Sequence, residues 1–159
     1  MGSIRSSSSG RNGSSERRKE WIMADRDLNH LHPQVEAAAR AAIAECEAAG
    51  MPVLVTCTYR SDQEQNELYA QGRTKPGRIV TNARAGESFH QYRLALDLYP
   101  LVNGKPDFSG THPNWHKIAA IFIKHGFEWG YNWKRFREMP HFQMTGGHPL
   151  SYYQRGGQL

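Results

Sequence analysis

Apolar residues recur at helical spacing in three stretches of the chain, and each stretch is bounded by residues that start or stop helices. The first stretch is rich in alanine and ends at Gly50, the second opens with the capping-box letters SDQE, and the third has Pro113 in its first turn and ends at Gly126. The pattern therefore predicts helices over residues 34–50, 61–72 and 113–126.

Four shorter stretches have the composition or the alternation of strands. Residues 52–59 (PVLVTCTY) are rich in β-branched side chains, and a shorter run lies at residues 79–81. In LALDLYP the side chains alternate until Pro100, where we expect the strand to end, and another short strand begins at His141. Because these elements mix without a regular βαβ rhythm, we predict an α+β fold, a single small domain with a short, mostly antiparallel sheet flanked by about three helices.

The first 22 residues differ from the rest of the chain. They are rich in serine, glycine and arginine, and they hold too few apolar side chains to offset their chain entropy. We interpret residues 1–22 as a disordered leader, vector-derived rather than a natural arm, residues 23–148 as the folded domain and residues 149–159 as a C-terminal tail. Five basic and two acidic residues of the leader account for +3 of the net charge of +5. The remaining charge of +2 is weak support for nucleic-acid binding.

The two cysteines, Cys46 and Cys57, do not form a CxxC pair. One lies in a predicted helix and the other in a predicted strand. We expect both to be buried free thiols, made in a reducing compartment.

A carboxylate interrupts the apolar run LALDLYP. Alternation turns the three leucines of RLALDLY to one face, so that Asp97 on the other face meets a site or solvent. His90 lies seven residues earlier, and the later stretch EMPH supplies Glu138 and His141. Two histidines and one carboxylate form a three-ligand set for catalytic zinc, and a further carboxylate nearby can act as a general base. Burial of a charge there is costly unless it is paired or binds a metal.

Two signatures resemble those of a known family. SFHQYRLALD (residues 88–97) resembles the SxHxxGxAxD signature of the VanY-type D-Ala-D-Ala carboxypeptidase and L-alanyl-D-glutamate peptidase superfamily, and EMPHFQ is similar to its second signature. Residues 59–90 and 126–143 are similar to the phage-endolysin branch of this superfamily. The resemblance spans residues 27–144 and implies the fold of D-Ala-D-Ala peptidases and Hedgehog domains.

Carried over position by position, the resemblance implies one zinc ion bound by His90, Asp97 and His141, with Glu138 as the catalytic base. It makes residues 23–148 a zinc peptidase domain. The resemblance also implies Arg60 in substrate binding and stabilisation of the oxyanion, and Ser88 as a support of the substrate site by hydrogen bonding. Trp129 belongs to an aromatic set that we expect in the core or the cleft wall, and it is the candidate of that set for a substrate contact. The role of Gln65 stays open.

Two positions depart from the family pattern. Arg93 replaces the glycine of the first signature, and Tyr131 stands where glycine is usual. Glycine would suit a positive φ. We therefore expect an ordinary extended backbone at Arg93, with the side chain pointing outward.

The function implied by the resemblance is a zinc metallopeptidase, an endolysin that hydrolyses the L-Ala–D-Glu bond of the peptidoglycan stem peptide. One alternative is a D-Ala-D-Ala carboxypeptidase. Another is a non-catalytic cell-wall-binding domain on the same scaffold, although Glu138 argues against it because metal binding alone does not need this residue.

The expected partner is the peptidoglycan stem peptide, with no nucleic acid and no stable membrane insertion, and we expect a monomer. The sequence contains no apolar run of eighteen residues and no secretory signal. We expect synthesis in the host cytoplasm without a signal peptide, and action on the cell wall or in the periplasm.

Overall fold

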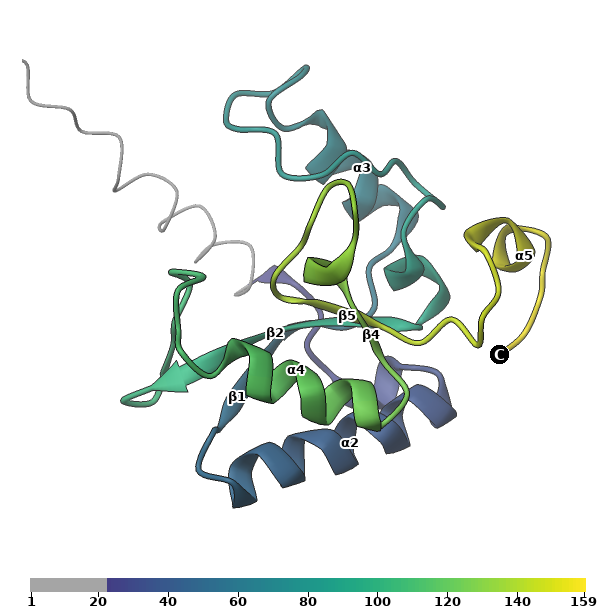
Figure 1. The fold of residues 1–159 in the computed structure, drawn as a ribbon. Helices are drawn as coiled ribbons and strands as arrows, with labels where there is room; N and C mark the ends of the chain where they lie inside the picture. Colours follow the sequence, from purple (N-terminus) through teal and green to yellow (C-terminus); the bar gives the residue numbers. More distant parts are fainter. Residues whose placement is uncertain (1–22) are drawn as a thin grey trace, which may run out of the picture.

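A short antiparallel sheet lies in the middle of the molecule, with α2 and α4 on one of its faces and α3 on the other (Figure 1). The computed structural model describes residues 23–159. The strands are β1 (Val53–Cys57), β2 (Ala95–Val102), β3 (Lys105–Pro106), β4 (Glu128–Trp129) and β5 (His141–Gln143). The helices are α2 (Pro33–Ala48), α3 (Asp62–Ala70), α4 (Trp115–Lys124) and α5 (Leu150–Gln154), with short 3-10 helices η1 (Leu28–His30), η2 (Phe89–Tyr92) and η3 (Gly130–Asn132). The strand order is β1-β2-β5-β4, and β3 pairs with β2. This architecture confirms the predicted α+β fold.

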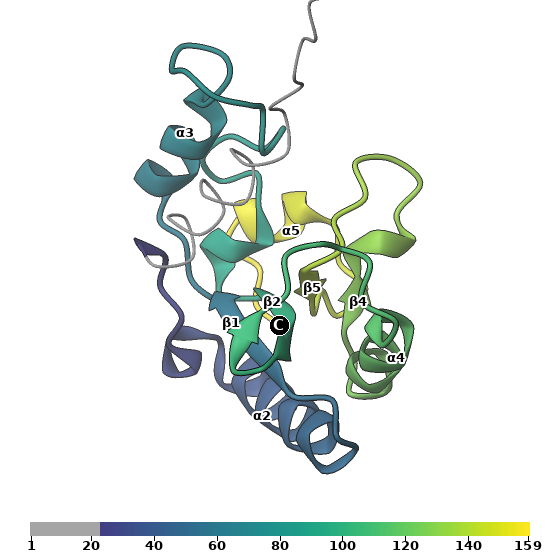
Figure 2. The same ribbon diagram turned by 90° about the vertical axis from the view of Figure 1, so that its left-hand side faces the viewer.

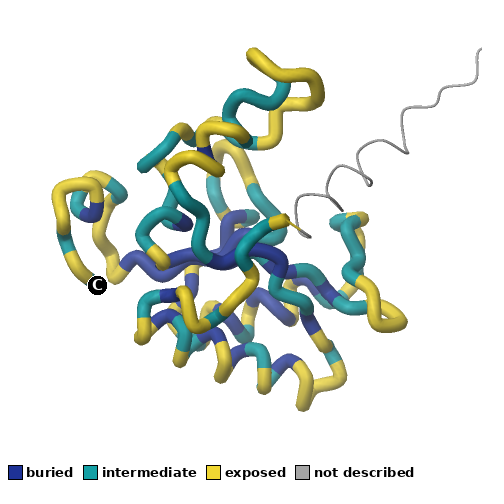
Figure 3. The backbone as a smooth tube through the Cα atoms, turned by 180° about the vertical axis from the view of Figure 1, so that it is seen from behind, coloured by how far each residue is buried: buried dark blue, intermediate teal, exposed yellow. Residues whose placement is uncertain are grey.

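The core lies between the sheet and the pair α2 and α4. The three leucines at positions 94, 96 and 98 turn toward it and are almost fully buried, as the alternation predicts. Helix α4 contributes Ile118 and Phe122, and α2 contributes Ala39 and Ala42, whose small side chains let the helix approach closely. Figure 3 shows the buried positions following the central strands and the inner sides of these helices. Full burial of each large side chain stabilises the fold by roughly 1.5–3 kcal/mol.

The residues predicted to start or stop helices do so in the structure. The Ser61 hydroxyl accepts from the Glu64 N–H, and the Glu64 carboxylate accepts from the Ser61 N–H, which completes the capping box of α3. Gly50 and Gly126 follow α2 and α4 with positive φ values of 74° and 98°. Both cysteines are free and buried, as predicted.

The predicted strand at residues 79–81 is wrong. This segment pairs with no strand of the described chain, and Ile79 and Val80 are 57% and 41% exposed. The carbonyl of Arg78 accepts from the Gln71 side chain, and that of Thr81 accepts from the Arg73 guanidinium. Side chains therefore satisfy the backbone groups that a strand partner would otherwise use.

Pro100 does not end β2, contrary to the sequence prediction. The strand continues to Val102, and Pro100 is buried opposite Val53. The Pro100 carbonyl accepts from the Asp107 N–H, while the next N–H, that of Leu101, donates to Pro52. The hydrogen bonding of β2 thus continues past Pro100, although proline has no N–H to donate.

The C-terminal segment contains a helix that the sequence pattern did not predict. Tyr153 of α5 is 5% exposed, and its hydroxyl donates to the Thr145 carbonyl at 2.6 Å. Its ring meets the Phe89 ring edge-on, with centroids 5.8 Å apart. Helix α5 therefore packs behind η2.

The leader prediction for residues 1–22 falls outside the described residues. Within residues 23–159, no helix is both long enough and apolar enough to cross a membrane.

Candidate metal centre and cleft

Asp97 lies in the middle of three paired strands. Its backbone is opposite Cys57 of β1 on one side and opposite His141 of β5 on the other. His90 reaches the same place from η2, the turn that leads into β2. Ser88 caps that turn, because its hydroxyl accepts from the His90 N–H at 3.3 Å. Strand pairing and one capped turn thus bring together residues that are far apart in the sequence.

Arg93 makes the bend between η2 and β2, and the expectation of an extended backbone there is wrong. Its φ of 62° and ψ of 27° lie in the left-handed region that favours glycine. The Arg93 N–H donates to the His90 carbonyl, and its own carbonyl accepts from the His32 N–H. Its side chain donates to the His30 carbonyl at 2.7 Å and lies over the Tyr59 ring. These contacts offset the cost of the conformation, so that arginine serves where the signature has glycine.

The two predicted histidine ligands converge on one carboxylate oxygen of the third, Asp97. Asp97 Oδ1 lies 3.2 Å from His90 Nε2 and 3.3 Å from His141 Nδ1. Glu138 Oε2 is 3.5 Å from the same nitrogen of His141. His90 and His141 are 2% and 5% exposed at their side chains, whereas Glu138 is 42% exposed and stands at the rim.

The other nitrogen of each ring has a partner that fixes the tautomer. His90 Nδ1 lies 2.7 Å from the Thr58 carbonyl oxygen, which can only accept, so Nδ1 carries the hydrogen. His141 Nε2 lies 2.8 Å from Gln143 Oε1, which also only accepts. The neutral rings therefore turn two lone pairs toward the Asp97 carboxylate. The Asp97 carboxylate and the two lone pairs that face it require a cation or a proton between them.

This donor set fits a zinc ion. Ligand bonds of 2.0–2.1 Å in a tetrahedron separate the donor atoms by about 3.3 Å. The spacings of Asp97 Oδ1 from His90 Nε2 and from His141 Nδ1, 3.2 Å and 3.3 Å, match that value. Hydrogen bonds from the second ring nitrogens to fixed acceptors are also the usual outer partners of histidine ligands.

The electrostatics of the metal-free protein follow from the same arrangement. Burial would raise the pKa of Asp97, but the His90 and His141 rings outweigh this effect and hold it well below its usual range. Burial disfavours the charged form of His90, yet the Asp97 carboxylate raises the pKa of His90 to about 10. Desolvation by the surrounding walls raises the pKa of Glu138 above its ordinary value. In the metal-free protein, His90 and Asp97 therefore favour their charged forms. Glu138 beside them keeps its proton to a higher pH than an ordinary glutamate does.

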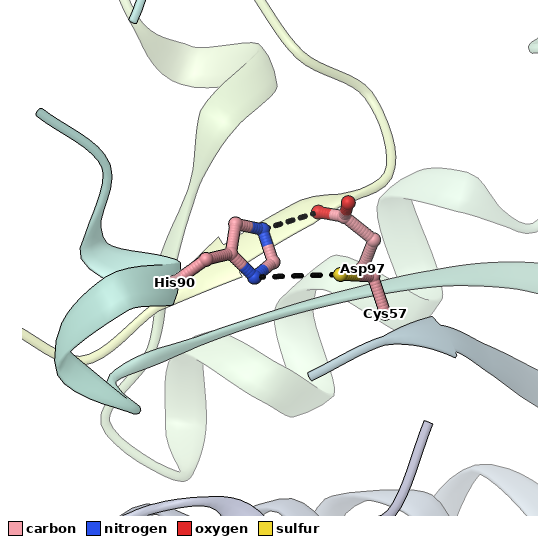
Figure 4. A group of neighbouring side chains, drawn as sticks. All are labelled: Cys57, His90 and Asp97. Carbon is pink, nitrogen blue, oxygen red and sulfur yellow. Dashed lines mark hydrogen bonds and ion pairs between the residues drawn. The ribbon is translucent and has the colours of Figure 1, made fainter. Parts of the chain in front are cut away.

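Cys57 offers a second possible grouping, with His90 and Asp97, among the described residues. Its sulfur is 3.8 Å from His90 Nδ1, whereas Asp97 faces Nε2 at the other side of the ring (Figure 4). Because Nδ1 is engaged with Thr58, an ion held by His90 Nε2 and Asp97 would have His141 Nδ1, 3.3 Å from Asp97 Oδ1, as its candidate third ligand. Cys57 lies behind the centre, 3.4 Å from Arg60 Nη2.

Arg60 lies beside the centre, where the sequence places it. Its Nη2 is 3.7 Å from Asp97 Oδ2, and its Nη1 donates to Gln65 Oε1 at 3.1 Å. Gln65 is fully buried, and its amide nitrogen donates to the Ala83 carbonyl at 2.8 Å. The Gln91 amide donates to both the Arg60 carbonyl and Gln65 Oε1. Gln65, whose role the sequence left open, therefore fixes the guanidinium.

Two hollows meet at Asp97, with volumes of about 630 Å³ and 600 Å³. Helix α3 with its following loop forms one side, and the loop between η3 and β5 rises opposite it (Figure 2). Arg60, Asp97 and Tyr99 line both hollows. The first is also lined by Cys57 and Phe108, and the second by Ser88, Trp133, Glu138 and both histidines. The arrangement leaves room for an extended chain to cross the centre.

Trp129 lies in the core, one of the two places expected for it, and does not line these hollows, so the structure gives no support to a substrate contact there. It is 3% exposed and stacks on Phe142 in the core, and its indole N–H donates to the Met139 carbonyl at 2.7 Å. Trp129 thereby holds the loop that carries Glu138. Trp133 lines the second hollow instead, and its ring centroid is 5.2 Å from that of His141.

Known proteins share both sequence and fold with this chain. The family model described as D-alanyl-D-alanine carboxypeptidase matches residues 81–144. A peptidoglycan L-alanyl-D-glutamate endopeptidase of Bacillus subtilis is 42% identical over 122 residues, which are 72% of this chain and 73% of the relative. An L-alanyl-D-glutamate peptidase of Listeria phage A118 is 29% identical over 75% of this chain, but the match spans only 40% of the phage protein. A crystal structure of a vancomycin-resistance D,D-pentapeptidase in complex with Zn(II) has the same fold, with a TM-score of 0.57 and 15% identity over 79% of this chain and 78% of that one.

Proposed function

We propose a function from one premise: the chain belongs to the D-alanyl-D-alanine carboxypeptidase family of peptidases, together with its Bacillus subtilis relative. Within that family, we propose a zinc-dependent endopeptidase that cleaves the L-Ala–D-Glu bond of the peptidoglycan stem peptide. The observation that carries the metal assignment is the approach of His90 Nε2 and His141 Nδ1 to Asp97 Oδ1, from two buried histidines.

A zinc ion bound there would supply Lewis acidity toward a carbonyl oxygen and would lower the pKa of a water molecule. Glu138 stands next to the ligand set with a raised pKa, which suits a group that accepts a proton from water and returns it to the leaving amine. Arg60 is the fixed cation of the site, and its guanidinium can donate to the developing oxyanion or to a substrate carboxylate.

The choice of scissile bond rests on the relatives. The Bacillus subtilis protein is an L-alanyl-D-glutamate endopeptidase by name, and at 42% identity it is the more similar of the two relatives compared. The phage relative supports an endolysin that degrades the bacterial cell wall. The rival activity is that of a D-Ala-D-Ala carboxypeptidase, which the description of the family model favours. A non-catalytic wall-binding domain would have no use for a carboxyl at the position of Glu138.

Digestion of purified peptidoglycan by the zinc-loaded protein tests the proposal, with mass spectrometry of the soluble products. Free stem peptides that begin with D-Glu are expected. Release of terminal D-alanine instead would establish the rival carboxypeptidase, and the absence of any new amino group would overturn the peptidase proposal.

Glu138→Gln isolates the role of the base. The amide cannot accept a proton, so kcat should fall by about 10²–10⁴, while zinc content measured by elemental analysis stays at one ion per chain. Glu47→Gln, which alters an exposed carboxylate on α2, is the matched control and should digest peptidoglycan like the wild type. Full activity of Glu138→Gln would remove this residue from the mechanism.

A further inference from the structure

The geometry points to Glu128 and Gln143 as positioning residues that determine which nitrogen of His141 is available to a metal. The inference rests on the proposed metal site, although its main readout is the tautomer of one ring and does not require peptidase activity. Nothing in the sequence pattern singles out either residue. Both lie on the side of His141 that faces away from Asp97.

The three residues form a chain of hydrogen bonds across two paired strands. Glu128 of β4 is directly opposite Gln143 of β5. Glu128 Oε2 accepts from Gln143 Nε2 at 3.2 Å, and Gln143 Oε1 accepts from His141 Nε2 at 2.8 Å. His141 and Gln143 are two positions apart on the same strand, so their side chains share one face.

The chemistry of the groups sets the direction of this chain. A carboxylate has no hydrogen to donate, so Gln143 must present its NH2 group to Glu128 and its oxygen to His141. That oxygen in turn accepts only, so the hydrogen of the neutral His141 ring resides on Nε2. The lone pair then lies on Nδ1, 3.3 Å from Asp97 Oδ1. Turning the Gln143 amide would place its oxygen against the Glu128 carboxylate and its NH2 group against Nε2.

Thr145 fixes the far end of the chain. Its hydroxyl accepts from the Gly147 N–H at 3.2 Å and donates to Glu128 Oε1 at 2.7 Å. Both oxygens of Glu128 therefore have donors, and the carboxylate is held opposite Gln143. Gln143 and Thr145 are each only 6% exposed, so water cannot easily replace the missing partner if one member is changed.

The two histidines differ in what holds them. The hydrogen on His90 Nδ1 bonds to a backbone carbonyl, that of Thr58, which no substitution removes. His141 depends on an amide that can turn, and this amide is oriented by a carboxylate on the exposed residue Glu128. His141 is therefore the ligand whose metal-binding nitrogen is set by side chains, and His90 is an internal reference for it.

Substitutions that keep the shape of the side chain test the inference. Gln143→Met removes both hydrogen bonds, and Glu128→Gln allows the Gln143 amide to turn. Zinc affinity, measured by competition with a chromophoric chelator, should fall about 10–100-fold in Gln143→Met and by less in Glu128→Gln. Gln34→Met, at an exposed position of α2, should match the wild type.

Nitrogen NMR of histidine-labelled protein supplies a readout that general destabilisation would not move. In the metal-free wild type, the neutral His141 ring should carry its hydrogen on Nε2, and in both variants the Nδ1–H form should appear, while Nδ1 of His90 stays protonated toward the Thr58 carbonyl. Unchanged affinity together with an unchanged His141 tautomer in Glu128→Gln would overturn the inference, even if Gln143→Met fails to fold. If the wild type binds no zinc, the proposed function fails, and the tautomer measurement still decides this inference separately.

Discussion

Arg93 adopts a left-handed backbone conformation that costs a non-glycine residue roughly 1–2 kcal/mol. The bend it makes sends the chain from η2 into β2, so the positions of His90 and Asp97 both depend on it. The guanidinium returns part of the cost through a hydrogen bond to the His30 carbonyl and a cation–π contact 4.1 Å from the Tyr59 ring centroid.

Two substitutions separate the strain at Arg93 from its contacts. Arg93→Ala loses the contacts and keeps the strained backbone, so it should lower the free energy of unfolding by about 1–2 kcal/mol. Arg93→Gly loses the same contacts but relieves the strain, and should be about 1 kcal/mol more stable than Arg93→Ala. Urea unfolding curves of the two variants measure the difference. An alanine variant as stable as the glycine variant would show that the left-handed backbone stores no strain.

At this scale, the sequence identifies residues whose chemistry is unusual for their place. Asp97 inside the apolar run LALDLYP can be recognised from the sequence, and the structure brings His90 and His141 to it. For Trp129 the sequence leaves core and cleft wall open, because an indole suits both, and in the structure its N–H donates to a backbone carbonyl in the core. Gln143 gives no signal, because its importance depends on Glu128 across the sheet.

The unpredicted helix α5 supports the turn that carries His90. Tyr153 packs on Phe89, the residue before His90, and also near Tyr92 at the end of the same turn. Its hydroxyl ties α5 to the chain just after β5 through the Thr145 carbonyl. One side chain thus connects the C-terminal helix with both segments that supply histidines.

Tyr153→Ala and Tyr153→Phe test this support. The alanine variant leaves a cavity beside Phe89 and should lose about 3 kcal/mol of stability or more. The phenylalanine variant keeps the packing and loses one hydrogen bond, which costs about 1 kcal/mol. Thermal unfolding followed by circular dichroism compares them. Equal losses in the two variants would mean that the hydroxyl, and not the ring, attaches α5.

Elements with their own local signals were predictable, and those that depend on a neighbour were not. The capping box of α3 and the glycines after α2 and α4 mark helix ends within the chain itself. Residues 79–81 have strand composition but pair with no strand of the described chain, and the side chains of Gln71 and Arg73 bind the carbonyls of Arg78 and Thr81. Helix α5 spans five residues and lacks a side-chain cap, so only its packing reveals it.

For the molecule as a whole, the candidate ligands come from η2, β2 and β5, which meet only in the folded state. A metal bound there therefore stabilises the folded chain and has no comparable site in the unfolded one. At a free zinc concentration of about 100 times Kd, the gain is about 2.7 kcal/mol.

Zinc should accordingly raise the melting temperature of the chelator-treated protein by roughly 10 °C. Differential scanning calorimetry with and without zinc measures the shift. His141→Ala, which removes one ligand, is the control in which the shift should disappear. A shift of the same size in His141→Ala would place the stabilising ion elsewhere on the protein.

The direct pairing of Asp97 with His141 has a mechanical consequence. After Asp97 the chain continues along β2 to Val102, forms β3, α4 and β4, and returns to the position opposite Asp97 in β5. A metal that joins these two side chains closes this excursion into a covalent-like ring. A force applied to the ends of the protein would then bypass everything inside the ring, and that part of the chain would extend only after the metal had left. The bound metal would in this way keep nearly a third of the chain from extending under force.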